Sequence, residues 1–319
     1  MYEFFDLIGT KTNFMDELTS GLKSKPKYIP GYYIYDKRGS KLFERICGLP
    51  EYYLTRTEMR ILDQSAEEIV APYKEDSALV VELGSGNLCK TDLLLRAFLK
   101  NRHRLKYIPI DISGDDLKDN SLKLYHNRPG IDVTACCGEY LDGLNYLDRF
   151  EERKLILWLG SSIGNFSKRK APGFLKKIKG VMHRDDGLLV GIDLKKDPKA
   201  VERAYNDSAG VTSAYHLNVL HRFNREFGAD FRVENFYHRS FYDSERGAVE
   251  AFIISNCEQT VCIRELDLEV TLKDGERIFN ELSCKYDPSE IETLAQDSGF
   301  SIKKQWFDKN NFFTLVLFE

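Results

Sequence analysis

The sequence predicts an α/β fold, in which helices cover both faces of a mainly parallel sheet, together with a second α+β lobe. Two observations lead to this prediction. Apolar strand runs alternate with helical patterns from about residue 57 to Asp193, and the pattern changes after Asp193. Right-handed crossovers between parallel strands would then give a doubly wound topology.

The elements of this sheet can be read in chain order. Residues 1–56 contain aromatic loops and a helical pattern at 41–47, and residues 57–71 form an amphipathic helix that Pro72 helps to end. The predicted strands are 78–83, 107–111, 131–136, 154–159 and 187–193. The predicted helices between and after them are 90–100, 114–127, 140–148 and 171–182.

The second half of the chain has a different pattern. Residues 195–228 look helical, and 231–282 hold several strands, including the alternating run at 266–272. A helix at 288–298 precedes strands 301–307 and 312–318, which would form an antiparallel closing hairpin. We therefore predict one domain from residues 57–194 together with 283–319, and a substrate-recognition lobe from residues 1–56 together with 195–282.

Composition limits the classes of protein that this chain can represent. The net charge is −4 and basic residues form no stripe, which argues against a nucleic-acid surface. No apolar run approaches the ~20 residues that a membrane span needs, and the N-terminus is a poor secretion signal. We expect a cytoplasmic protein, with a monomer as the default.

Cysteine and histidine spacing gives no sign of a metal site. The seven cysteines are an odd number and contain no CxxC pair, so neither a disulfide framework nor structural zinc is expected. His216 and His221 lie five residues apart and are interpreted as surface or packing residues.

A glycine turn follows the first buried strand. Gly84, Ser85 and Gly86 leave the strand at 78–83, where glycine lets the backbone approach a ligand closely. Asp111 ends the next strand, where a carboxylate can accept hydrogen bonds from both ribose hydroxyls. The pattern predicts an adenosine-type ligand, with a plain strand-to-helix turn as the alternative.

The same turn favours S-adenosylmethionine over a dinucleotide. GxGxxG is absent because Cys89 occupies the third glycine position, and no P-loop motif occurs. S-adenosylmethionine has no phosphate, so that glycine is dispensable. Lys90 can reach the methionine carboxylate of this cofactor, or else is a solvated lysine, and Glu139 with Tyr140 can contact adenine.

Several motifs in a fixed order carry a family resemblance. They are 49–58 (LPEYYLTRTE), 82–86 (ELGSG), 159–165 (LGSSIGN), 193–198 (DLKKDP), 204–207 (AYND) and 280–286 (NELSCKY). Together they resemble the histidine-specific Nα-methyltransferases of ergothioneine biosynthesis, from about Pro26 to the C-terminus. Segments 142–144 and 157–166 are as similar to the related fungal dimethylallyltryptophan N-methyltransferases. The resemblance implies a Rossmann-like class I methyltransferase sheet, whose closing hairpin is antiparallel.

The resemblance also implies roles for individual residues. The cofactor would contact Gly84, Ser85, Gly86, Lys90, Asp111, Glu139 and Tyr140. The substrate would contact Tyr52, Asn165, Tyr205, Glu281, Leu282 and Ser283, with Tyr35 and Tyr205 as the catalytic pair. Two positions depart from the family pattern. Glu139 replaces an expected Asp, and Ala251 replaces a larger Met, which would widen the side-chain pocket.

Glu281 and Ser283 have chemistry that suits an imidazole. Residues i and i+2 of a strand face the same side, so a carboxylate and a hydroxyl could serve the two ring nitrogens. Without the resemblance, both would be ordinary polar strand residues. The leading hypothesis is trimethylation of the α-amine of L-histidine to its betaine, hercynine. The alternatives are tryptophan, prenylated tryptophan or tyrosine as substrate, or a cofactor-binding protein without catalysis.

Overall fold

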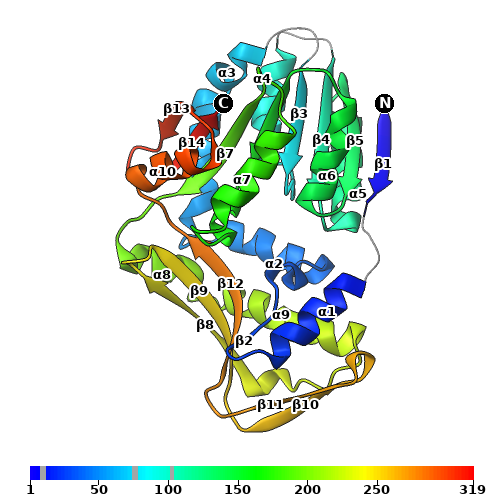
Figure 1. Ribbon diagram of the computed structural model, residues 1–319, viewed down its shortest axis with the longest axis vertical. Coiled ribbons are helices and arrows are strands. Elements are labelled where there is room, and N and C mark those ends of the chain that lie inside the picture. Colours follow the sequence, from blue (N-terminus) through cyan, green and yellow to red (C-terminus); the bar gives the residue numbers. More distant parts are fainter. Residues whose placement is uncertain (8–11, 74–77, 101–103) are drawn as a thin grey trace. The chain divides into compact units, whose positions relative to one another are not determined.

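The chain forms two compact units, each built from segments that are far apart in sequence (Figure 1). The computed structural model describes residues 1–7, 12–73, 78–100 and 104–319. Unit 1 comprises Met1–Gly9, Leu54–Lys195 and Cys284–Glu319, and unit 2 comprises Thr10–Tyr53 and Lys196–Ser283.

Unit 1 contains an eight-stranded sheet in the order β1-β5-β4-β3-β6-β7-β14-β13. Its strands are β1 (Tyr2–Asp6), β3 (Leu79–Leu83), β4 (Leu105–Asp111), β5 (Ile131–Cys137), β6 (Lys154–Trp158), β7 (Gly187–Asp193), β13 (Ile302–Phe307) and β14 (Phe313–Phe318). Neighbours from β1 to β7 are parallel, whereas β14 is antiparallel to both β7 and β13. The predicted parallel sheet with an antiparallel closing hairpin is confirmed.

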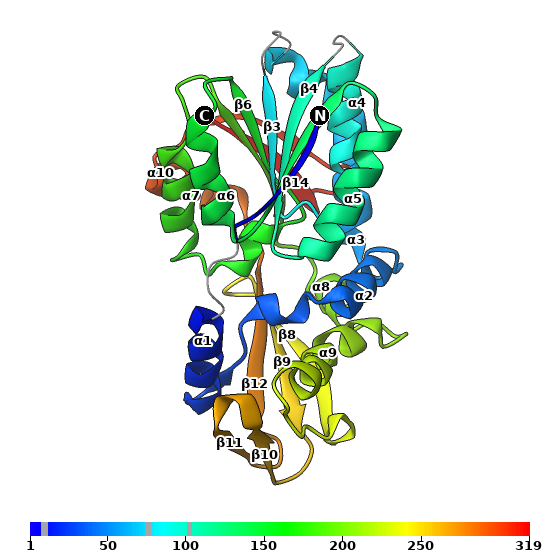
Figure 2. The same ribbon diagram turned by 90° about the vertical axis from the view of Figure 1, so that its right-hand side faces the viewer.

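Helices cover both faces of this sheet, which explains why its central strands are apolar throughout. Every residue of β3, β6 and β7 is buried, as expected for parallel strands packed on both sides. Helices α4 and α5 lie on one face, and α6 and α7 lie on the other (Figure 2). The helices of unit 1 are α3 (Tyr53–Val70), α4 (Thr91–Leu99), α5 (Gly114–Asn127), α6 (Tyr140–Tyr146), α7 (Ala171–Gly180) and α10 (Pro288–Ser298).

Local signals fix the ends of α10. The Asp287 side chain accepts the backbone N–H of Glu290 at 3.0 Å, and the Glu290 side chain accepts that of Asp287 at 3.0 Å, which forms a capping box. Pro288 occupies the first turn and Gly299, with φ 75°, follows the last residue. These signals explain why the prediction of 288–298 matches the helix.

The predicted boundary of the second lobe is wrong at the N-terminus. The predicted lobe includes residues 1–56, but β1 pairs in parallel with β5, with Tyr2 opposite Val133. Its five residues, YEFFD, form a short strand at the sheet edge, so the sequence gives little sign of the pairing. Residues 8–11 of the predicted range lie outside the described residues.

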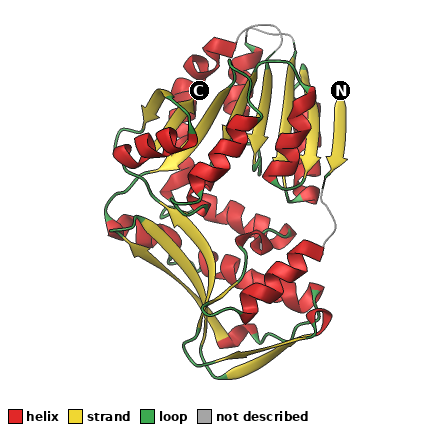
Figure 3. Cartoon of the chain, in the orientation of Figure 1, coloured by secondary structure: helices red, strands yellow, loops and turns green. Residues whose placement is uncertain are grey.

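Unit 2 packs helices against a smaller sheet (Figure 3). Its strands are β2 (Lys27–Tyr28), β8 (Phe236–Asp243), β9 (Ala248–Ser255) and β12 (Arg277–Cys284), in the order β2-β12-β9-β8, and a separate pair, β10 (Gln259–Ile263) and β11 (Leu268–Leu272). Its helices are α1 (Thr12–Lys23), α2 (Lys37–Cys47), α8 (Pro198–Tyr205) and α9 (Val211–Glu226). Leu22 of α1, Phe223 of α9 and Ile278 of β12 belong to one buried apolar cluster.

Candidate active site

The glycine turn after β3 adopts a left-handed backbone at both glycines. Gly84 has φ 74° and Gly86 has φ 51°, a region that other residues enter only with strain. A Cβ on Gly84 would lie 2.9 Å from the Tyr140 hydroxyl, whereas a Cβ on Gly86 would meet nothing within 4 Å. Glycine is therefore needed at Gly84 for both space and conformation, and at Gly86 for conformation alone.

Asp111 is held by the same turn. Its carboxylate accepts the backbone N–H groups of Gly86 and Ser113, each at 3.0 Å. Burial raises the pKa of Asp111 above its ordinary value. The hydroxyl of Ser85, between the two glycines of the turn, is buried and has no hydrogen-bond partner among the residues that the structure describes. An orphaned buried hydroxyl at the turn fits a site built for a polar ligand.

A second carboxyl group, Glu82, lies inside the sheet and was not singled out from the sequence. Glu82 accepts hydrogen bonds from the hydroxyls of Thr91 and Tyr107, which join β3 to α4 and β4. Burial raises the pKa of Glu82 to about 7. An acidic residue within the apolar run 79–83 was the signal that could have identified it.

Lys90 lies against a carboxylate that the sequence analysis also missed. Its Nζ is 2.9 Å from Oε2 of Glu58, which is buried in α3, and its own side chain is only 24% exposed. The backbone N–H of Gly160 donates to both oxygens of the Glu58 carboxylate, at 2.8 Å to Oε1 and 3.0 Å to Oε2. Lys90 is therefore a paired cation at the start of α4, and the solvated alternative does not hold.

Tyr140 and Asn165 lie on the segments that follow β5 and β6. The Tyr140 ring packs edge-on against Trp158 at 6.1 Å between centroids, and burial raises the pKa of Tyr140 to about 12. Glu139 precedes α6 without a capping hydrogen bond from its side chain. Asn165 ends the short helix η4 (Ser162–Asn165) and is exposed, and Ser161 enters that helix with φ 58°.

The predicted aromatic substrate residues gather within unit 2. The Tyr205 hydroxyl lies 2.8 Å from the Ser283 hydroxyl, and the Tyr205 ring packs edge-on to Tyr52 at 6.2 Å. Tyr35 packs edge-on against Tyr215 at 6.0 Å. Burial, followed by the nearby Tyr205 hydroxyl, raises the pKa of Tyr52 well above its ordinary value. The Tyr52 phenol therefore stays neutral at physiological pH and can orient a ligand by hydrogen bonding.

Strand β12 presents Glu281 and Ser283 on one face. Strand alternation places Leu282 on the other face, so the structure does not bring its side chain to the predicted cluster. Ala251, on the neighbouring strand β9, is buried.

His216, interpreted from sequence as a surface or packing residue, has polar partners in the interior of unit 2. It is 1% exposed, its Nδ1 lies 2.8 Å from Asn280 Oδ1, and its Nε2 lies 3.7 Å from Glu281 Oε2. A lone histidine in a helical pattern gave no signal for this contact, because its partners follow 64 and 65 residues later in the chain.

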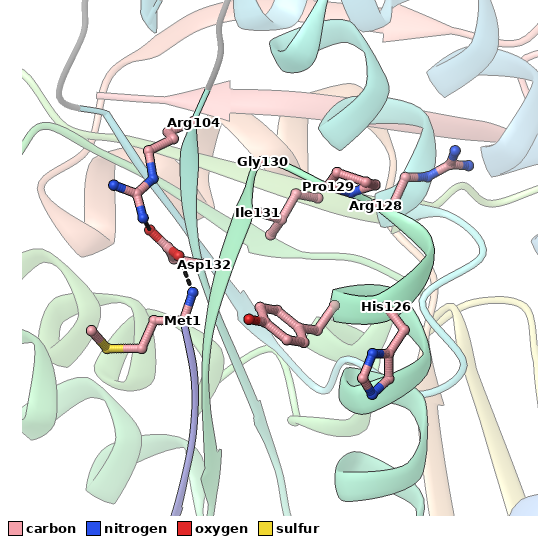
Figure 4. A pocket seen from close by; sticks show the side chains of 9 residues that line it. Met1, Arg104, His126, Arg128, Pro129, Gly130, Ile131 and Asp132 are labelled. Carbon is pink, nitrogen blue, oxygen red and sulfur yellow. Dashed lines mark hydrogen bonds and ion pairs between the residues drawn. The ribbon is translucent and has the colours of Figure 1, made fainter.

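A pocket at the opposite end of the sheet is not part of this site. Figure 4 shows it at the start of β5, where Asp132 contacts the N-terminal amine and Arg104. Ligands of open α/β sheets bind beyond the carboxyl ends of the strands, where Asp111 and the glycine turn lie. Within the described residues, no cluster of metal-ligating side chains occurs, and no helix has the length and apolar character to span a membrane.

The chain is similar to several known proteins. The family model for histidine-specific, S-adenosylmethionine-dependent methyltransferases matches residues 14–319. A histidine N-alpha-methyltransferase from Mycolicibacterium smegmatis is 36% identical, over 94% of this chain and 93% of that protein. Ergothioneine biosynthesis protein 1 from Neurospora crassa is 34% identical over 96% of this chain, which spans 35% of that protein.

Another fungal relative is less similar in sequence. The 4-dimethylallyltryptophan N-methyltransferase of Claviceps purpurea is 26% identical over 91% of this chain and 90% of that protein. The predicted resemblance and the predicted cofactor are both confirmed. The chain is an enzyme that belongs to the family of histidine-specific methyltransferases, which depend on S-adenosylmethionine.

Proposed function

We propose that this protein transfers three methyl groups, one at a time, to the α-amine of L-histidine and forms its betaine, hercynine. The observation that carries the proposal is the 36% identity to a histidine N-alpha-methyltransferase over 94% of the chain. Supporting chemistry comes from unit 2, where Glu281 and Ser283 share a face of β12 with neutral tyrosine hydroxyls nearby.

The cofactor half of the proposal rests on unit 1. The cofactor carries the methyl group on a sulfonium, so the amine nitrogen forms its new bond to carbon while the C–S bond breaks, and the leaving group is the neutral thioether S-adenosylhomocysteine, which needs no metal or acid to depart. The residues proposed to hold the cofactor are Gly84, Ser85, Gly86, Lys90, Asp111, Glu139 and Tyr140. Asp111 would accept the ribose hydroxyls, Lys90 would meet the methionine carboxylate, and Glu139 with Tyr140 would contact the adenine. The orphaned Ser85 hydroxyl and the paired Lys90 support this fit.

The substrate half of the proposal is a matter of orientation. Tyr52 and Asn165 would bind the carboxylate of the amino acid, and Tyr35 and Tyr205 would orient its amine. Methyl transfer needs a neutral amine lone pair aimed at the methyl carbon, at roughly 3–3.5 Å. Neutral phenols and an amide serve this purpose without adding a second cation. Glu281 would accept a hydrogen bond from an imidazole N–H, and Ser283 would serve the other ring nitrogen.

The test is an unbiased substrate screen. The purified protein is incubated with S-adenosylmethionine carrying a labelled methyl group and with each of the twenty amino acids, and products are weighed by mass spectrometry. The expected result is mono-, di- and trimethylated histidine, with little label on other amino acids. Labelling of another amino acid while histidine stays inert would refute the histidine substrate but not methyl transfer.

A second candidate is N-methylation of tryptophan, prenylated tryptophan or tyrosine. It is favoured by the small, buried Ala251 and by the fungal relative that is 26% identical. Changing Glu281 to Ala separates the two candidates, because it removes the proposed imidazole acceptor. A histidine enzyme should lose at least ~100-fold in kcat/KM for histidine, since a buried charged hydrogen bond is lost. A tryptophan enzyme should keep most of its activity.

The division of labour, the assembly and the cellular location are proposed on sequence grounds. Unit 2 would be the substrate-recognition lobe, and the protein would act as a monomer in the cytoplasm. Light scattering on the purified protein tests the monomer, for which a mass near 36.9 kDa is expected. Cell fractionation tests the location.

A further inference from the structure

A buried polar chain lies behind the proposed imidazole acceptor. Within unit 2, the His216 ring stacks on the His238 ring at 4.3 Å with an interplanar angle of 6°. His238 Nε2 lies 2.9 Å from the Ser240 hydroxyl. His216 reaches Asn280 on one side and the Glu281 carboxylate on the other. The His216 ring therefore has a hydrogen-bond partner at Nδ1, whereas the carboxylate oxygen that faces Nε2 at 3.7 Å makes an electrostatic contact longer than a hydrogen bond.

Both imidazoles are neutral. Burial lowers the pKa of His216 to about 4 and that of His238 to about 2. A neutral imidazole has one N–H and one lone pair, so His216 can donate either to Asn280 or to Glu281, but not to both.

The Glu281 carboxylate decides which nitrogen of His216 carries the proton. If Nδ1 donated to Asn280 Oδ1, the Nε2 lone pair would face carboxylate oxygen Oε2 at 3.7 Å, which is repulsive. Turning the Asn280 amide lets its Nδ2, which otherwise lacks a hydrogen-bond partner among the described residues, donate to Nδ1 instead. The proton then sits on Nε2 and points at the carboxylate. One Asn280 amide atom lacks a protein partner either way, so the electrostatic contact with Glu281 favours the second arrangement.

We propose that His216 is a positioning residue for Glu281: its Nε2–H, with Nε2 3.7 Å from Oε2, attracts one oxygen of the carboxylate electrostatically, so that Glu281 is oriented in advance to receive the imidazole of the substrate. This inference rests on the proposed histidine substrate and deepens it. The turned Asn280 amide donates to Nδ1 in the tautomer that Glu281 selects, and the His238 ring stacks on the plane of the His216 ring. Specificity for an imidazole therefore depends on two layers, the carboxylate and the neutral ring behind it.

The test compares two amide replacements of His216, which differ in length by one methylene. In His216→Gln, the amide nitrogen can take the place of Nε2 and still donate to Glu281. In His216→Asn, the amide nitrogen takes the place of Nδ1 and cannot donate to Glu281. Steady-state KM and kcat for L-histidine are measured at saturating cofactor, and the melting temperature of each variant checks folding. His221→Gln, a matched change on the same helix, is the control, because His221 lies near Arg38 and Arg225 rather than Glu281.

The Gln and Asn variants of His216 should differ in their KM for L-histidine. We expect His216→Asn to raise KM for histidine about tenfold, because the carboxylate loses the N–H dipole that orients it, with kcat changed less than about threefold. His216→Gln and His221→Gln should stay within about threefold of wild type. Equal KM values for the Gln and Asn variants, at similar melting temperatures, would overturn the inference.

A second measurement asks whether the effect acts through Glu281. Histidine binding to the complex with S-adenosylhomocysteine is measured by calorimetry for His216→Asn in the wild-type and Glu281→Gln backgrounds. The loss of histidine affinity caused by His216→Asn should largely vanish in the Glu281→Gln background. An undiminished effect would overturn the proposal, and if Glu281→Gln binds too weakly to measure, the comparison of Gln with Asn decides alone. If the wild-type enzyme neither binds nor methylates histidine, the proposed function is refuted instead.

Discussion

At the scale of single residues, the Lys90 ammonium and the Glu58 carboxylate form a pair that also holds the backbone of Gly160. The loop that begins at Gly160 leads to Asn165, the proposed carboxylate ligand. A cofactor carboxylate that binds Lys90 would thus share the ammonium with Glu58. The pair explains why a cation is tolerated at a largely buried position.

Removing this cation should weaken cofactor binding. We expect Lys90→Met to raise the dissociation constant of S-adenosylhomocysteine at least tenfold, because a charged hydrogen bond is lost and Glu58 is left buried without its cation. Lys100→Met is the control, since Lys100 is exposed and pairs with Glu67 near the other end of α4. Calorimetry measures both constants. An unchanged constant for Lys90→Met would exclude a role for Lys90 in cofactor binding.

Glu82 should give the protein a specific pH dependence. Its pKa is raised from 4.5 to about 7 by burial, so between these values the folded state binds more protons than the unfolded state. This contribution to stability is fully present below pH 4.5 and is lost as the pH rises through 7. Glu82→Gln lacks it.

Urea unfolding at pH 5 and pH 8 measures this effect. The free energy of unfolding of wild type, relative to Glu82→Gln, should fall by on the order of 2 kcal/mol between the two pH values. The buried histidines act with the opposite sign, but they are present in both proteins and cancel. A constant difference would mean that the Glu82 carboxyl has an ordinary pKa when folded.

The residues that sequence reasoning found and missed differ in how local their signals are. Gly84 and Asp111 were found because Gly84 directly follows one apolar strand and Asp111 ends the next. Glu58 and His216 were missed because their roles arise from partners about a hundred and about sixty residues away, respectively. Nothing in a local pattern separates such a residue from one that packs or is solvated.

At the scale of elements, the turn after β3 distinguishes two glycines that look equivalent in sequence. Gly84→Ala meets both a left-handed backbone and the Tyr140 hydroxyl at 2.9 Å, whereas Gly86→Ala meets the backbone strain alone. We expect Gly86→Ala to lower the free energy of unfolding by about 1–2 kcal/mol, and Gly84→Ala to lower it further. Thermal and urea unfolding give both values.

A second change identifies the cause of the extra loss. Tyr140→Phe removes the hydroxyl that an alanine at 84 would meet, so it should restore part of the stability in the Gly84→Ala background. The same change should restore nothing in the Gly86→Ala background. Equal effects in both backgrounds would show that Tyr140 does not limit the space at Gly84.

The elements of unit 1 were predicted closely and those of unit 2 only as a block. Buried parallel strands are continuous apolar runs and the connecting helices are amphipathic, so 187–193 and 114–127 match β7 and α5. In unit 2 the order β2-β12-β9-β8 depends on pairing between distant segments, which no local pattern specifies. The short strand β1 was missed for the same reason.

At the scale of the whole molecule, the proposed cofactor residues belong to unit 1 and most proposed substrate residues belong to unit 2. Hydrogen exchange should therefore respond to the two ligands in different segments. S-adenosylhomocysteine should slow exchange at 83–90 and 111–113, and added L-histidine should slow it at 205 and 280–283. Histidine protection confined to unit 1 would contradict the assignment of substrate recognition to unit 2.

The pattern change at Asp193 predicted that the main sheet is interrupted by a long insertion and then completed. The structure has the same order of events: β7 ends at Asp193, and β13 and β14 return to the sheet after unit 2. This could be predicted because the strand–helix rhythm is a local property of the sequence that stops and resumes. The exact limits of each unit could not, because they depend on which distant strands pair.

The position of β14 has a consequence for biosynthesis. This strand follows the other described strands in the sequence, yet it is buried between β7 and β13 rather than at an edge. While the nascent chain emerges from the ribosome, the apolar flank of β7 stays unpaired until residues 313–318 arrive. A chaperone that binds extended apolar segments would find its target during this interval, and a ribosome that stalls before residue 313 would leave a product prone to aggregate.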